Sequence, residues 1–152
     1  MLRTVLLLIS VLATSLYPGV VHAVMPPQHY ADRSQNSKIK AIAVIVDVQR
    51  LHIGKRYTEK KVSFRTDFAL TTDTGELFTG TCKSVDTPFQ EANVMVGGNI
   101  YFYPAEGQRV FVTVSDDGGE ITSLTPMTQE LEHAVRETPE KLRYGIGNAG
   151  VK

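Results

Sequence analysis

Basic residues and one tyrosine are concentrated in a short stretch, residues 55–65, in which Glu59 is the only acidic residue. Ammonium and guanidinium groups form charge-assisted hydrogen bonds with phosphate and carboxylate, and an aromatic ring can stack on a ligand. We therefore predict a surface that binds an anionic ligand or partner. Its candidate residues are Lys55, Arg56, Tyr57, Lys60, Lys61 and Arg65. The alternative is an exposed hairpin whose charges are only solvated and discourage edge-to-edge aggregation.

Acidic residues dominate a later stretch, residues 116–140, in which Arg136 is the only basic residue. This opposition of charges predicts a molecule that is polar from end to end and could associate head to tail with copies of itself. The alternative is again a solvated surface of turns and helix faces. The acidic residues are Asp116, Asp117, Glu120, Glu130, Glu132, Glu137 and Glu140.

The sequence contains no catalytic signature. His29, His52 and His133 match no spacing typical of a metal site, and no nucleophile-elbow motif occurs. Cys82 fits a small core residue better than a reactive thiol. We therefore predict a non-enzymatic binding or adaptor module of the cell envelope, without a cofactor or metal. The alternatives are a structural subunit of an envelope assembly and a small hydrolase.

Residues 1–23 have the pattern of a secretory signal peptide, with Arg3 before an apolar stretch and Val21-His22-Ala23 as the cleavage site. The alternative is a retained membrane anchor, which Pro18 would interrupt near its end. Cleavage would remove Arg3 and change the formal net charge from zero to −1. The remaining chain would have no overall field that recruits nucleic acid or anionic lipid, so any charge effect must be local.

The compartment follows from two absences in the sequence. A single cysteine excludes an internal disulfide, and no asparagine lies in a glycosylation site of the type Asn-x-Ser/Thr. Both favour a bacterial periplasmic or secreted protein over one from a eukaryotic secretory route. We therefore expect an exported protein with no transmembrane span in the mature chain.

Apolar residues alternate with polar ones in the stretches that must position the basic residues. The pattern is clearest at 61–71, where Val62, Phe64 and Phe68 share one parity, and it predicts a half-buried strand. The preceding strand, 38–53, is long enough that we expect it to bend or carry a bulge. Further strands are predicted at 76–84, 99–103, 109–115 and 120–124.

Two helices are predicted from their start signals. Thr87-Pro88-Phe89-Gln90 forms a capping-box pattern between the third and fourth strands. Thr125-Pro126 opens an amphipathic helix that we expect to pack on the strands through Met127, Leu131 and Val135.

The order of these elements predicts a mainly β fold, a small antiparallel barrel or roll of five to six strands. A short helix would lie between strands 3 and 4, and the amphipathic helix would follow at the C-terminal end. The layout resembles that of the OB-fold, whose strands 2 and 3 and adjoining loops bind ligands. An SH3-like barrel is the alternative. We expect one domain at 38–143, a flexible lead-in at 24–37 and a flexible tail at 144–152.

Overall fold

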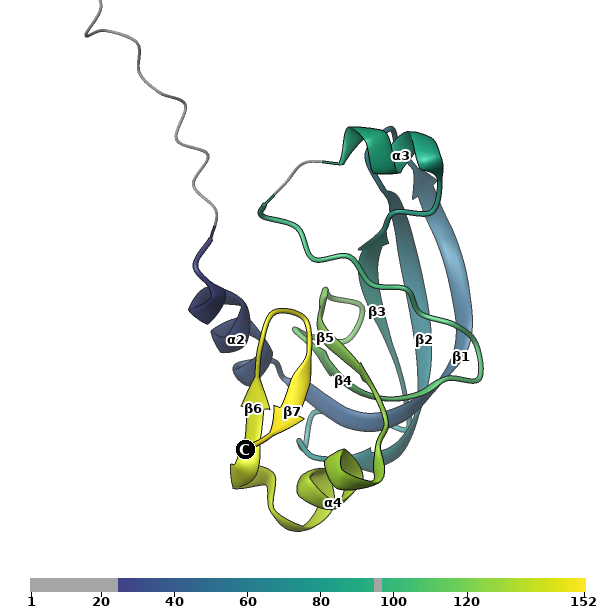
Figure 1. The fold of residues 1–152 in the computed structure, drawn as a ribbon. Coiled ribbons are helices and arrows are strands. Elements are labelled where there is room, and N and C mark those ends of the chain that lie inside the picture. The colour runs from purple at the N-terminus through teal and green to yellow at the C-terminus, as the bar shows by residue number, and fades with distance from the viewer. Residues whose placement is uncertain (1–24, 95–96) are drawn as a thin grey trace, which may run out of the picture.

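A computed structural model describes residues 25–94 and 97–152 (Figure 1). The predicted signal peptide, residues 1–23, lies outside the described residues. The described chain is mainly β, as predicted, with a five-stranded antiparallel sheet, a two-stranded sheet and three α-helices. No helix in this part of the chain is long and apolar enough to cross a membrane.

The larger sheet has the strand order β3-β2-β1-β4-β5, with every neighbouring pair antiparallel. The five strands confirm five of the six that the sequence predicts, although their ends differ by up to three residues. The remaining predicted strand, at 99–103, is instead a segment with one isolated bridge, between Tyr101 and Lys83. The strands are β1 (Ile39–Ile53), β2 (Thr58–Ala69), β3 (Leu77–Ser84), β4 (Arg109–Val114) and β5 (Ile121–Pro126).

β1 is the central strand and is irregular, as its length predicts. Its pairing with β2 shifts register at three places, between Ile42 and Ala43, between Ile45 and Asp47, and between Arg50 and His52. Bulges of this kind increase the local twist of a strand. The sheet consequently curls, and its two edge strands β3 and β5 approach each other at the parallel bridge between Thr81 and Glu120.

A closed barrel is not found among the described residues. β3 and β5 share only that isolated bridge, because the segment that contains Tyr101 occupies the adjoining part of the β3 edge. There the amide of Phe102 donates to the carbonyl of Lys83 at 2.8 Å. The architecture is therefore a curled, incompletely closed sheet whose β3 edge is covered by two other segments.

Two apolar clusters lie on opposite faces of β1. The inner cluster fills the curl of the sheet and includes Ile45, Phe64 and Phe78, of which the two phenylalanine rings stack at 4.9 Å between centroids. The outer cluster contains Ile42 and lies beneath the C-terminal elements. Residues 41–43 of β1 are all buried, because both of its faces are covered there.

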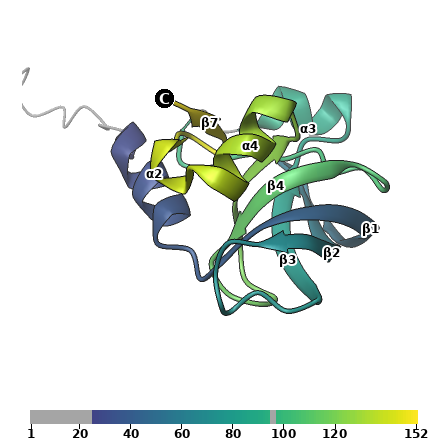
Figure 2. The same cartoon turned by 90° about the horizontal axis from the view of Figure 1, so that it is seen from below.

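The C-terminal helix α4 (Gln129–Glu137) packs on the outer face of the sheet, as predicted (Figure 2). Leu131 and Val135 are buried, and Met127 packs against the same cluster. The helix begins later than Thr125-Pro126 indicates, because these residues extend β5, and Thr128 is the N-cap. The short helix α3 (Pro88–Asn93) begins as predicted, with Thr87 accepting from the Gln90 amide at 3.2 Å.

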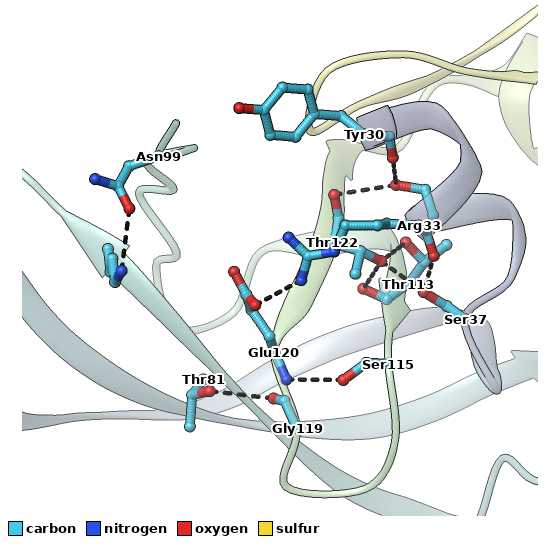
Figure 3. A network of polar contacts seen from close by, with 12 residues as sticks. Tyr30, Arg33, Ser37, Thr81, Asn99, Thr113, Ser115, Gly119, Glu120 and Thr122 are labelled. Atoms are coloured by element: carbon cyan, nitrogen blue, oxygen red, sulfur yellow. Dashed lines mark hydrogen bonds and ion pairs between the residues drawn. The ribbon is translucent and has the colours of Figure 1, made fainter. Parts of the chain in front are cut away.

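The expected flexible lead-in at 24–37 differs from the structure over most of its length, because Pro27–Gln35 forms helix α2. The hydroxyls of Ser37 and Thr122 are 2.7 Å apart (Figure 3). Ser34 donates to the carbonyl of Thr122 at 3.1 Å. Arg33 forms an ion pair with Glu120 at 2.6 Å. The buried residues of this helix are only Tyr30 and Ser34, so it lacks the apolar period that predicts a helix.

The expected flexible tail at 144–152 also differs from the structure. The 3-10 turn η1 (Pro139–Lys141) leads into a small hairpin of β6 (Leu142–Tyr144) and β7 (Ala149–Val151). Gly147, with a φ of 70°, lies in its turn, and an added Cβ there would be 2.7 Å from Ile100. The glycines that suggest a loose tail thus permit a tight turn and close packing.

Candidate functional site

The loop between β1 and β2 carries the first three of the predicted site residues, and α3 fixes it in place. The Gly54 amide donates to the Tyr57 carbonyl at 2.9 Å. The Gln90 side-chain amide donates to the Gly54 carbonyl at 2.9 Å and to the Thr58 hydroxyl at 3.0 Å. Its oxygen accepts from the Asp86 amide at 2.9 Å. Gln90 is only 1% exposed, so this amide is a buried clamp between α3 and the loop.

The register between β2 and β3 places Lys61 and Arg65 on the face opposite the inner cluster. Lys61 pairs with Thr81, and Glu59, two residues before Lys61, pairs with Lys83, two residues after Thr81. Directly paired residues share one face of a sheet. We call this the outer face of β2–β3, which comprises Glu59, Lys61, Ser63, Arg65, Leu77, Thr79, Thr81 and Lys83.

Lys60 belongs to the other face of β2 and does not join this group. It forms an ion pair with Asp86 at 3.0 Å, and its side chain is only 12% exposed. Burial tends to raise the pKa of the Asp86 carboxyl, but hydrogen bonds and charge, mainly from Lys60, outweigh it and lower that pKa. The predicted basic cluster is therefore divided by the pleat of β2, because residues 60 and 61 point to opposite sides.

Tyr57 contacts a cation of the protein itself. The Lys83 ammonium lies 4.7 Å from the centroid of the Tyr57 ring and donates to Asn99 at 3.0 Å. One face of this ring is thus already engaged. The basic segment alone does not predict Lys83. The alternation in β3 does indicate that Lys83 lies on the outer face, because Phe78 and Cys82 are buried on the opposite face.

Most of the cations on the outer face of β2–β3 and on the loop between β1 and β2 lack an acidic partner. Within residues 25–94 and 97–152, Lys55, Lys61, Arg65 and Lys83 form no ion pair within 4.0 Å. The backbone around them is fixed by strand pairing and by the Gln90 clamp. Unpaired cations on an ordered backbone can bind an external anion without first breaking an internal pair.

The acidic stretch is partly neutralised by contrast. Asp116 pairs with Lys38 at 2.9 Å and Glu120 pairs with Arg33. Glu132 accepts two hydrogen bonds from Arg109, at 2.7 and 2.8 Å, and a third from Arg136 at 3.0 Å. These contacts lower the pKa of Glu132 to about 2. Fewer negative charges are therefore available for head-to-tail association than the sequence indicates.

A cavity of about 270 Å³ opens beside the outer face, at the seam where two segments meet the edge of β3. Its apolar lining includes Ile100, Phe102 and Ile121. Its charged lining is Lys83 with two acidic residues, Glu59 and Glu120. Figure 3 shows Thr81, Gly119 and Glu120 along this seam. Its dimensions suit a single side chain of a partner better than a large ligand.

Cys82 also lines this cavity, and its environment disfavours the reactive thiolate form. It is buried, as predicted, and burial raises its pKa to about 11. The thiol is consequently neutral near physiological pH, and a neutral thiol is a weak nucleophile. Among the described residues no group of three His, Cys, Asp or Glu side chains is placed to hold a metal ion.

Comparison with known proteins gives no relative from which a function could be transferred. No protein-family model, curated protein or solved structure matches the chain.

Proposed function

We propose that this protein is an exported, non-enzymatic binding or adaptor module that holds an anionic partner in the cell envelope. The partner would lie on the outer face of β2–β3 and on the loop between β1 and β2. The observation that best supports this proposal is the difference in ion pairing. Lys60 forms an ion pair within the described chain, and Lys55, Lys61, Arg65 and Lys83 do not. We therefore retain Lys55, Arg56, Tyr57, Lys61 and Arg65 as binding residues, add Lys83, and give Lys60 a structural role.

The strand arrangement supports an OB-like interpretation of the sheet. β1, β2 and β3 form a meander, α3 follows β3, and β4 and β5 return beside β1, with one parallel bridge between β3 and β5. In that layout ligands bind on strands 2 and 3 and the adjoining loops, which is where the unpaired cations lie. The position of the basic residues and the layout thus favour the same surface.

Charge reversal on the outer face tests this proposal. The variant Lys61→Glu/Arg65→Glu should lose its partners in a pull-down from an envelope extract, and wild-type binding should weaken steeply as sodium chloride is raised. The control Lys141→Glu/Lys152→Glu makes the same change in net charge at two exposed residues elsewhere. Recovery of the same partners by wild type and both variants would contradict the proposal.

A second candidate, a structural subunit of an envelope assembly, is favoured by large apolar side chains around the same end of the molecule. Ile53 and Phe89 are each 61% exposed and Tyr103 is 62% exposed. Ile53 adjoins the clamped loop, and Phe89 precedes Gln90 in α3. If apolar contact dominates, Ile53→Ser/Phe89→Ser should abolish assembly, and the Lys61→Glu/Arg65→Glu variant should leave it intact.

A further inference from the structure

A hollow of about 500 Å³ lies between α2, the end of β2 and the stretch from η1 to β6. Figure 1 shows α2 beside β6, which together bound this region. No residue of the outer face of β2–β3 lines it. The residues that matter for its chemistry are Gln35, Lys40, Leu70, Glu140, Arg143 and Tyr144.

Lys40 is the unexplained group in this hollow. Its ammonium donates to the Gln35 carbonyl and lies 5.4 Å from the centroid of the Tyr144 ring. Among the described residues no carboxylate forms an ion pair with it. Partial burial lowers the pKa of Lys40, and no acidic group counteracts that effect. The Lys40 side chain is half-buried, and an external anion could reach its ammonium without first breaking an ion pair.

The neighbouring Lys38 shows the ordinary arrangement. It is exposed and forms an ion pair with Asp116 at 2.9 Å, and this contact raises its pKa. Two lysines that are two residues apart thus have opposite environments. Only Lys40 faces a cavity that is large enough for an external group.

We propose that this hollow binds a small organic monoanion, with its carboxylate or phosphate diester group at the Lys40 ammonium and its body against Leu70 and Tyr144. Arg143 supplies a second cation and Glu140 one negative charge, so the three charged side chains leave one net positive charge. That balance matches a monoanion better than a polyanion. The site is independent of the surface proposed above.

The charged and titratable side chains around the hollow define how pH affects this site. They are Lys40 on β1, Glu140 on η1, and Arg143 and Tyr144 on β6. Burial raises the pKa of the Tyr144 hydroxyl, which favours its neutral form. Binding requires the ammonium form, and it should weaken as the pH rises through the pKa of Lys40. By linkage, the bound anion should raise that pKa.

Titration of the protein with acetate, benzoate and dimethyl phosphate at constant ionic strength, followed by ¹H–¹⁵N NMR, tests the site. Benzamide is the uncharged control for benzoate. At least one anion should cause saturable shifts at the amides of Ala31, Leu70 and Tyr144, and benzamide should not. The variant Lys40→Gln should bind about tenfold more weakly, and Lys38→Gln should bind as wild type does.

Several outcomes would overturn the inference. They are the absence of saturable shifts with all three anions, equal shifts with benzamide, or unchanged affinity in Lys40→Gln. A second measurement guards against misfolding of the variant, because the wild-type Lys40 side-chain pKa, followed by NMR, should rise when the anion is present. Neither result of the pull-down with Lys61→Glu/Arg65→Glu affects these anion titrations. The two proposals can therefore fail separately.

Discussion

The buried side chain of Gln90 donates a hydrogen bond to the carbonyl of Gly54 at 2.9 Å, and it thereby joins α3 to the loop that carries Lys55 and Arg56. This contact links two segments that are far apart in the sequence. It also explains why a loop rich in charged residues has a defined position.

We predict that Gln90→Leu destabilises the protein by about 2–4 kcal/mol, because it leaves the Gly54 carbonyl, the Thr58 hydroxyl and the Asp86 amide without their buried partner. Urea unfolding measures this change. Hydrogen exchange should also become faster at the amides of the loop. The control is Gln129→Leu, because Gln129 is exposed at the start of α4. Equal stability of the two variants would show that the clamp contributes little.

Gly80 should not tolerate even a methyl group. A Cβ at this position would lie 2.7 Å from Cγ1 of Ile121 and 3.3 Å from Cγ1 of Val114, in the interior of the curl. We expect Gly80→Ala to cost about 1–3 kcal/mol through overpacking. Gly150→Ala is the matched control in β7, where an added Cβ has no atom within 4 Å. A Gly80→Ala protein with wild-type melting temperature would contradict the close approach of β3 to β5.

The contacts of Glu132 should make the stability of the protein depend on pH in the acid range. Hydrogen bonds from Arg109 and Arg136 lower the pKa of Glu132 to about 2, from 4.5 for an unperturbed group. A depressed folded-state pKa stabilises the protein above the unfolded-state pKa and loses this effect as the pH falls through the folded-state value. Glu132→Gln should therefore melt lower than wild type near neutral pH.

The difference in melting temperature between Glu132→Gln and wild type should shrink as the pH falls from about 4.5 to about 2. Glu130→Gln on the same helix is the control, because Glu130 is exposed and forms no ion pair among the described residues. A difference that stays constant with pH would rule out this role for Glu132.

Cys82 should resist thiol reagents in the native protein, because it is buried and its pKa is raised to about 11. Labelling with a chromogenic disulfide should be slow in buffer and complete in denaturant. Cys82→Ala should lower stability by about 1 kcal/mol through a small cavity and leave partner binding unchanged. Rapid labelling of the native protein would instead indicate a reactive thiol and would reopen the hydrolase alternative.

The strands were predictable because their signals are local. Val62 and Phe64 alternate with polar residues, and Thr87 with Pro88 specifies the start of α3, so these elements appear where the pattern places them. Helix α2 was not predictable in this way. Its buried residues are Tyr30 and Ser34, and Ser34 is held by a hydrogen bond to a strand distant in sequence.

The candidate surface was predictable in part. The sequence identifies Lys61 and Arg65, but it groups them with Lys60, which the pleat turns toward Asp86. Lys83 joins the surface only through the register of β2 with β3. Pairing between strands depends on tertiary contacts, so charge density along the chain cannot supply it.

The position of β1 has a consequence for the order of folding. β1 pairs with β2 along most of its length, and short turns join β1, β2 and β3, whereas β4 can pair with β1 only after a loop containing β2, β3 and α3 has closed. Long loops cost more entropy to close, so we expect the meander to form first and β4 to complete the inner cluster late. Truncating Val112 in β4 should then mainly accelerate unfolding, whereas truncating Val62 in β2 should slow refolding.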